Sequence, residues 1–221
     1  MSEETPTVSL ALVKELREKT GVGLVDCQKT LAEAGGDVDK ALRLLREKGL
    51  AKAAKKASRV ATDGAVGSYI HPGAKIGVLI EVNCETDFVA NTDEFKALVK
   101  DLAMQVAAAS PRYVRREEVP ADEIESERAI YRKQAEASGK PAQVIERIVD
   151  GQVERFYKDV CLLEQAFVKQ SDRSVGDLVQ EAIVRFGVNV AVRRFARYQL
   201  GETQSRASDA KEDVTGGRAG G

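Results

Sequence analysis

The sequence predicts an α+β protein, in which a small helical module precedes a larger lobe that combines helices with a small antiparallel sheet. Two observations carry this prediction. Residues 9–49 contain three short segments with apolar residues at helical spacing. Residues 64–84 contain two strand-like runs on either side of Pro72-Gly73, which is the pattern of a β-hairpin. Strands joined by hairpins pair antiparallel, and we expect the later helical segments to pack on that sheet.

Composition indicates a globular protein with one or two domains. The chain has 221 residues, of which 43% are hydrophobic and 31% charged. Its net charge of −1 lacks the basic excess of an electrostatically driven nucleic-acid binder. Three widely spaced cysteines favour a reducing compartment, and the acidic N-terminus does not have the pattern of a secretory signal. We therefore expect a cytoplasmic protein that enters no membrane.

The predicted helical module spans residues 1–49. Asp26 and Asp37 can cap its second and third helices, because a short polar side chain accepts a hydrogen bond from the free amides at a helix start. Gly49 fits the position just past the third helix. Three helices in about forty residues form a minimal bundle that is only marginally stable alone.

A basic segment, residues 50–63, follows the module. Lys52, Lys55, Lys56 and Arg59 recur there at helical spacing, and large apolar side chains are almost absent. This pattern favours a solvated helical linker. The alternative is a basic strip that contacts an acidic partner surface.

The core lobe is predicted to span residues 64–200. After its β-hairpin, Asn91 or Thr92 can cap a helix with a continuous apolar stripe. Residues 120–163 form two polar helical segments, with Pro141 at the start of the second, and they predict a helical hairpin that projects from the body.

The lobe is predicted to end with a short helix and a strand. Ser174 can cap the helix, and Gly187 ends it. The following strand alternates, but its phase changes at Arg193-Arg194, so a bulge there would restore one buried face. Residues 201–221 lack a periodic apolar face and predict a disordered tail.

The sequence contains no recognisable catalytic motif. It has no P-loop, no nucleophile elbow and no cysteine or histidine cluster with zinc spacing. The lone histidine, His71, lies beside the predicted hairpin turn, where a surface role is the simplest interpretation. We expect no catalytic residue, metal or cofactor, and therefore a binding or regulatory protein rather than an enzyme.

One connection carries unusual residues. In "NCETDFVANTDEF", residues 83–95, Asp87 and Phe88 stand where a short connection usually has Gly, Asn or Pro. One interpretation places Phe88 in the core beneath the hairpin. The other makes it an exposed contact with a partner.

Longer motifs identify a family. "VKELREKTGVGLVDCQKTL" and "AGGDVDKALRLLREKG" resemble the N-terminal module of bacterial elongation factor Ts, "IEVNCETDFVANTDEF" resembles its most diagnostic motif, and "RFGVNVAVRRFARYQLG" resembles its C-terminal strand. The likeness extends from about Val8 to Gly201. It implies a ubiquitin-associated-like three-helix module and a nucleotide exchange factor for the GTPase elongation factor Tu, without a nucleotide site of its own.

The resemblance also implies a site. The family segment that matches Thr86, Asp87, Phe88 and Val89 disturbs the magnesium site of the GTPase. We expect Phe88 to act as a wedge, Asp87 as a polar contact, Thr86 to shape the turn and Val89 to anchor it. Leu24 and Val25 match a loop that the family uses as a second contact, although such residues are equally often buried.

The chain resembles the shorter form of the family, with one core lobe. Shorter members can replace the missing lobe with a second protomer, so we expect a homodimer that is formed around the core sheet or the C-terminal strand and binds two GTPases. Two other functions stay open. One is a ubiquitin-associated-type adaptor without exchange activity. The weaker one is a nucleic-acid accessory that uses the basic residues 52–59 with Arg193, Arg194 and Arg197.

Overall fold

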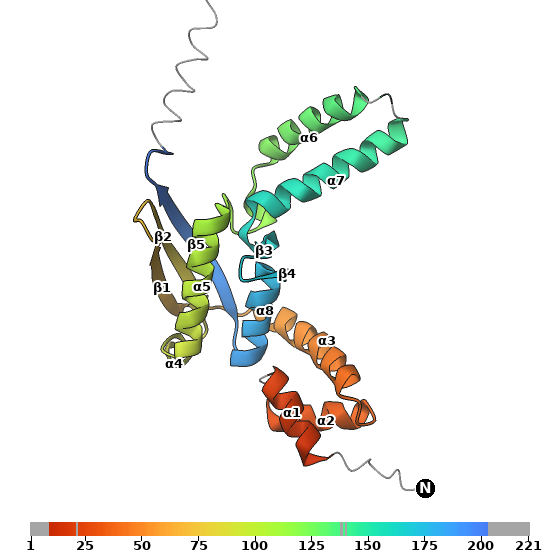
Figure 1. Cartoon of the computed structure of the whole chain (residues 1–221), viewed down its shortest axis with the longest axis vertical. Coiled ribbons are helices and arrows are strands. Elements are labelled where there is room, and N and C mark those ends of the chain that lie inside the picture. Colours follow the sequence, from red (N-terminus) through yellow and green to blue (C-terminus); the bar gives the residue numbers. More distant parts are fainter. Residues whose placement is uncertain (1–8, 21, 138, 140, 203–221) are drawn as a thin grey trace, which may run out of the picture.

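The computed structural model describes residues 9–20, 22–137, 139 and 141–202. Figure 1 shows a central lobe from which the N-terminal helices and a helical hairpin project on the same side. The predicted α+β class is confirmed. The elements in chain order are α1 (Leu10–Thr20), α2 (Leu24–Glu33), α3 (Val38–Ala57), β1 (Asp63–Ile70), β2 (Ile76–Cys84), α4 (Asp87–Ala90), α5 (Asp93–Ala109), α6 (Ala121–Glu136), α7 (Ala142–Val160), β3 (Ala166–Phe167), β4 (Gln170–Ser174), α8 (Val175–Phe186) and β5 (Val190–Gln199), with 3-10 turns at Arg116–Glu118 and Leu162–Glu164.

The N-terminal module is a three-helix bundle with its own small core, in which Leu16 and Leu31 are fully buried. Asp37 caps α3 as predicted, since its Oδ1 accepts a hydrogen bond from the amide of Lys40 at 2.9 Å. The prediction that Asp26 caps α2 was wrong. Its N-cap is Gly23, and Asp26 lies in the first turn, where a carboxylate still favours the positive end of the helix dipole.

Helix α3 is longer than the sequence indicated. It runs through Gly49 to Ala57, so Gly49 is inside the helix and the prediction that it ends there was wrong. The reason is tertiary packing. A Cβ added at Gly49 would lie 3.2 Å from Cγ2 of Val184 on α8, so the missing side chain lets the two helices approach. The first part of the predicted basic linker therefore continues α3.

The main sheet has the strand order β1-β2-β5, and both pairs are antiparallel. Its register contains the bulge that the sequence predicted. Glu81 pairs with Arg194 while the next residue, Val82, pairs with Val192, which leaves Arg193 as the extra residue. The bulge keeps Val192 and Phe195 on the same face although three positions separate them.

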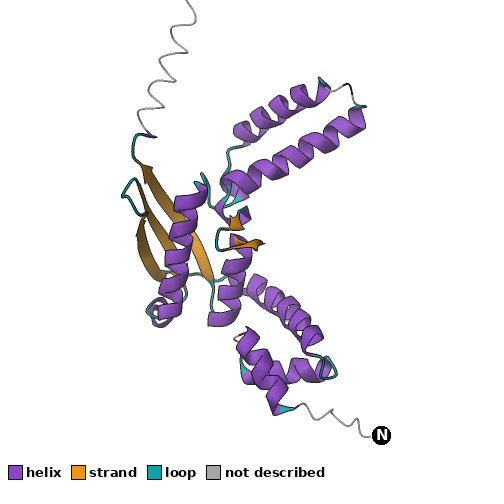
Figure 2. Ribbon diagram, viewed as in Figure 1, coloured by secondary structure: helices purple, strands orange, loops and turns teal. Residues whose placement is uncertain are grey.

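The core lies between one face of this sheet and the helices α5 and α8 (Figure 2). Phe95 and Leu102 of α5 are fully buried against Val78, Ile80 and Val82 of β2. The outer face of the sheet is much more exposed and carries several large apolar side chains. The α5 stripe predicted from the sequence is thus confirmed, and so is the Thr92 cap, whose Oγ1 accepts a hydrogen bond from the Phe95 amide at 3.2 Å.

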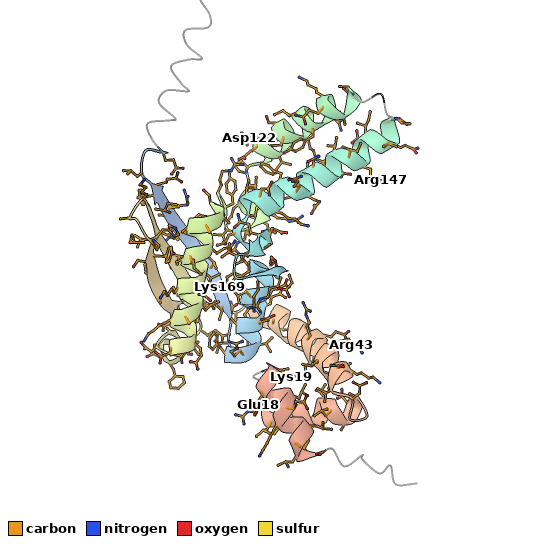
Figure 3. The ribbon with its side chains drawn as sticks, in the orientation of Figure 1. Glu18, Lys19, Arg43, Asp122, Arg147 and Lys169 are labelled. Carbon is orange, nitrogen blue, oxygen red and sulfur yellow. The ribbon has the colours of Figure 1, made fainter. Side chains whose placement is uncertain are left out.

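Helices α6 and α7 form the predicted projecting hairpin. Its root is held by Arg116, whose guanidinium binds the carboxylates of both Glu154 and Glu164 at 2.5–2.9 Å. Figure 3 labels two of its exposed charged residues, Asp122 on α6 and Arg147 on α7. None of the helices within the described residues has the length and apolar character needed to cross a bilayer.

The sequence did not predict the small hairpin β3–β4. The strands are short, and β4 reads "QSDRS", which has no apolar alternation. Buried glutamines hold this part of the fold instead. Gln105 of α5 donates to the carbonyl of Ala166 at 3.2 Å and accepts from the amide of Val168 at 2.8 Å. Lys169, labelled in Figure 3, adds an ion pair to Asp101 at 2.6 Å.

Candidate partner-binding site

The segment Thr86–Val89 lies on a single helical turn, α4, between the end of β2 and the start of α5. Thr86 caps this turn, since its Oγ1 accepts a hydrogen bond from the Val89 amide at 3.4 Å. At the other end, the hydroxyl of Thr92 donates to the carbonyl of Val89 at 2.8 Å. A four-residue helix is not stable by itself, so these caps and the flanking elements determine its position.

Phe88 points away from the protein. Its side chain is 80% exposed, whereas the next residues, Val89 and Ala90, are 8% and 7% exposed and belong to the main core. The interpretation of Phe88 as a core residue is therefore wrong. Thr86 and Asp87 are also exposed, so the structure brings together a polar cap, a carboxylate and an aromatic side chain on one solvent-facing turn anchored by Val89.

A buried thiol supports the start of this turn. The Sγ of Cys84 donates a hydrogen bond to the carbonyl of Thr86 at 3.1 Å. Burial raises the pKa of the Cys84 thiol, so it stays protonated near neutral pH and keeps its donor. The role of Cys84 here is structural.

Two further residues connect the segment to other parts of the fold, and the sequence did not single them out. The backbone amide of Asn189 donates to Oε1 of Glu85 at 2.5 Å, and Oε2 of Glu85 lies 3.6 Å from an Nη of Arg59. Asn189 is only 4% exposed. The signal that could have found it is a polar residue inside the otherwise apolar run "VNVAV", because a buried amide must find hydrogen-bond partners.

Comparisons with known proteins support the resemblance over nearly the whole chain. The sequence model of the family described as elongation factor TS matches residues 26–202, which includes the α4 segment and Asn189. The chain is 57% identical to elongation factor Ts of Desulforamulus reducens over 91% of this chain and 93% of that protein. It is 59% identical to elongation factor Ts of Geobacter metallireducens, over 89% and 91% of the two chains. The chain belongs to the elongation factor Ts family.

As a member of the elongation factor Ts family, the chain is a translation elongation factor of the guanine nucleotide exchange class. The second predicted contact, Leu24 and Val25, lies in the first turn of α2. Both side chains are exposed, at 46% and 63%, so the burial that the sequence left open does not occur. Figure 1 shows α2 and α4 on different parts of the molecule, so these residues do not join the α4 segment in one site.

The basic side chains that the structure describes in residues 53–59 and β5 do not gather into one nucleic-acid surface. Arg194 binds Glu81 at 2.7 Å on the outer face of the sheet. Arg197 reaches the opposite face, where its guanidinium donates to the carbonyl of Ala107 at 3.4 Å. Arg59 is directed to Glu85. The geometry therefore gives the nucleic-acid interpretation no support.

Proposed function

We propose that this protein is a guanine nucleotide exchange factor for elongation factor Tu and that Phe88 is the side chain that promotes GDP release. The observation that carries the proposal is an aromatic ring, 80% exposed, on a turn that is capped by Thr86 and anchored by Val89. Exposing a phenylalanine side chain to water is unfavourable in free energy. Burying the ring against a partner surface removes this unfavourable contribution.

The proposed mechanism acts on the magnesium site of the GTPase. A GTPase of this class holds its nucleotide through P-loop amides, a lysine and a magnesium ion. The Phe88 ring enters beside that site and shifts the ligands of the ion, while the Asp87 carboxylate makes a polar contact next to it. Thr86 and Val89 keep the turn in place. The exchange factor itself needs no nucleotide site.

Energetic limits show that Phe88 does not act alone. Burying a phenylalanine contributes about 1.5–3 kcal/mol, which corresponds to about one to two decades in affinity. A larger weakening of GDP must come from lost magnesium and P-loop contacts in the GTPase. By linkage, GDP weakens the binding of the factor by the same ratio, so fresh nucleotide releases the factor.

The N-terminal module supplies the second contact in this proposal. Leu24 and Val25 present apolar surface at the start of α2, away from the module core. Contact there holds the factor on the GTPase, while Phe88 acts on the nucleotide site. Leu24 and Val25 therefore contribute to affinity without touching the nucleotide site.

We further propose that the protein acts in the cytoplasm as a homodimer that binds two GTPases. The support is the uncovered face of the main sheet, on which Val66, Ile70, Leu79 and Tyr198 are all more than half exposed. The Glu81–Arg194 ion pair lies on the same face. A two-fold axis through this face would bury the apolar residues against their own copies. It would also place Glu81 of one protomer near Arg194 of the other, which makes the face self-complementary.

The deciding experiment is stopped-flow release of a fluorescent GDP analogue from elongation factor Tu, with unlabelled GDP in excess. We expect the release rate to rise with the concentration of this protein and then saturate. If the protein binds the GTPase without accelerating release, the adaptor alternative is correct. If release is unchanged and no binding is detected, both the exchange function and the adaptor alternative fail.

A further inference from the structure

Three segments that are far apart in the sequence meet at Asn189. This residue lies in the turn between α8 and β5. Its side-chain amide donates to the carbonyls of Ala57 and Arg59, at 3.3 and 2.7 Å, and its backbone amide donates to Glu85. Asn189 therefore links the end of α3, which belongs to the N-terminal module, to the residue that precedes Thr86.

The contact to α3 provides a hydrogen-bond donor for a backbone carbonyl at the C-terminal end of that helix. The last four carbonyls of an α-helix have no partner within the helix, and the carbonyl of Ala57 is one of them. Asn189 supplies a buried donor for it. In the opposite direction, the side chain of Lys56 on α3 donates to the carbonyl of Gly187 in the turn. The end of α3 is thus fixed to the α8–β5 turn from both sides.

The contact to the α4 segment is equally specific. Glu85 is only partly exposed and uses its two carboxylate oxygens separately, one for the Asn189 amide and one toward Arg59 just after α3. Glu85 stands directly between β2 and the cap residue Thr86. A shift of Glu85 therefore moves the start of the turn that carries Phe88.

A packing contact further along α3 defines its direction. Gly49 lies against Val184 of α8, two turns before the hydrogen-bonded end of the helix. Figure 1 shows α3 running from the module to α8. One contact would leave a helix free to pivot, but two contacts along its length fix its orientation.

We propose that Asn189 and Glu85 are positioning residues that clamp the N-terminal module to the Thr86–Val89 segment, so that docking of the module determines where Phe88 meets the GTPase. This inference rests on the proposed exchange function. Its physical basis is preorganisation. When a rigid connection joins two contacts, binding at the first places the second in position, and little further conformational entropy is lost. A flexible connection loses that entropy when the second contact forms.

The first test measures the clamp without any GTPase. Spin labels are attached to Lys40→Cys on the module and Lys100→Cys on α5, both exposed positions, while the native cysteines at 27, 84 and 161 are buried. Pulsed electron paramagnetic resonance then gives the distance distribution in the full chain. We expect a narrow distribution in the parent and a broad one after Asn189→Ala.

A matched asparagine controls for the loss of an amide. Asn83 also donates to a backbone carbonyl, that of Asp63 at 3.2 Å, and its other hydrogen bond goes to Glu81 on the same strand. We expect Asn83→Ala to leave the distribution narrow. A narrow distribution in Asn189→Ala, or equal broadening in both variants, would overturn the clamp.

The second test asks whether the clamp transmits docking to exchange. We expect Asn189→Ala to lower the release rate at saturating factor about tenfold, which is a loss of about 1.4 kcal/mol. In a Val25→Asp background, where the module no longer docks, the same substitution should cost less than about twofold. Additive effects would show that Asn189 only supports the local fold, and the proposed coupling would fail.

Glu85 provides a conservative rescue. Glu85→Gln keeps an oxygen that accepts from the Asn189 amide, so it should retain both the narrow distribution and the exchange rate, and Glu85→Ala should lose both. If Glu85→Gln and Glu85→Ala behave alike, the hydrogen bond is not the relevant link. Absence of exchange by the unsubstituted protein would overturn the proposed function, and the distance measurement would still decide the clamp.

Discussion

Phe88 and Val89 are neighbours in the chain and face opposite environments, with 80% and 8% of their side chains exposed. Successive residues of a helix are rotated by about 100°, so one turn can bury one side chain and present the next to solvent. Here the buried valine joins the core between β2 and α5, and the exposed phenylalanine leaves it. The side chain that is free to contact a partner and the side chain that anchors the turn therefore belong to different residues, and each can be changed separately.

The variant Phe88→Ala tests the contribution of the exposed ring to GDP release. We expect its stability to equal that of the parent, because the removed ring makes little contact within the protein. Its stimulated GDP release should be about 10- to 100-fold slower, which corresponds to the loss of about 1.5–3 kcal/mol of aromatic burial in the complex. Thermal unfolding and stopped-flow release on the same sample measure both quantities.

The matched control is Phe95→Ala, which removes a fully buried ring seven residues later. It should reduce the free energy of unfolding by about 3–5 kcal/mol. Unchanged release by a folded Phe88→Ala protein would contradict the role of this side chain. Slow release accompanied by unfolding would return Phe88 to a structural role.

The cap of α4 gives a second prediction. Thr86→Ala removes the acceptor for the Val89 amide, and loss of such a cap costs about 0.5–2 kcal/mol. Since α4 has a single turn, we expect this cost to appear as slower GDP release and faster amide exchange at Val89. Thr86→Ser keeps the hydroxyl and should behave like the parent. Equal release by the alanine and serine variants would show that the cap is dispensable.

Local patterns predicted those parts of the fold that local chemistry determines. The β-hairpin, the Thr92 and Ser174 caps and the bulge at Arg193 all follow from residue types at fixed spacing, and each is confirmed. Gly49 was misplaced because its environment is set by Val184, which is distant in sequence. A glycine in a helical pattern indicates an end or a close approach, and only the tertiary contact distinguishes them.

The candidate site shows the same division. The family motif identified Thr86–Val89, but local sequence signals alone favoured a buried Phe88, which was wrong. A single turn contains too few residues for periodicity to define a face. Glu85 and Asn189 were missed since their contact joins positions more than a hundred residues apart. The roles assigned to Thr86, Asp87, Phe88, Val89, Leu24 and Val25 stay predictions until exchange is measured.

Two glycines should respond to alanine in opposite directions. Gly64 has a φ of +141°, and a Cβ there would lie 2.2 Å from the backbone oxygen of Val82. Gly64→Ala should therefore lower the free energy of unfolding by at least about 1–3 kcal/mol. Gly151 lies within α7 with no atom near the position of a Cβ, so Gly151→Ala should raise it by up to about 1 kcal/mol. Urea unfolding of both variants measures the difference, and a destabilised Gly151→Ala would contradict the open surroundings of that position.

Cys161 predicts a loss of stability in alkali. Burial raises the pKa of its thiol from the ordinary 9.0 to about 11. The folded state favours the neutral thiol, so this contribution is complete below pH 9 and disappears as the pH rises toward 11. The change is on the order of 3 kcal/mol.

Other groups titrate in the same range, so the comparison is with Cys161→Ala. Its free energy of unfolding should be lower than that of the parent at neutral pH, because the substitution leaves a small cavity. It should then fall less steeply between pH 9 and 11. Parallel curves for the two proteins would contradict the raised pKa.

The proposed homodimer is tested by two exposed apolar residues on different surfaces. Leu79, 51% exposed, lies at the centre of the outer sheet face, where it pairs with Ser68 and Ala196 on the neighbouring strands. Val168, 47% exposed, lies between β3 and β4. We expect Leu79→Asp to convert the dimer into a monomer, because the carboxylate would face its own copy across the two-fold axis, and Val168→Asp to remain dimeric. Sedimentation equilibrium at micromolar concentration measures both. A monomeric parent that forms a one-to-one complex with elongation factor Tu would contradict the dimer, and dissociation of both variants would place the interface elsewhere.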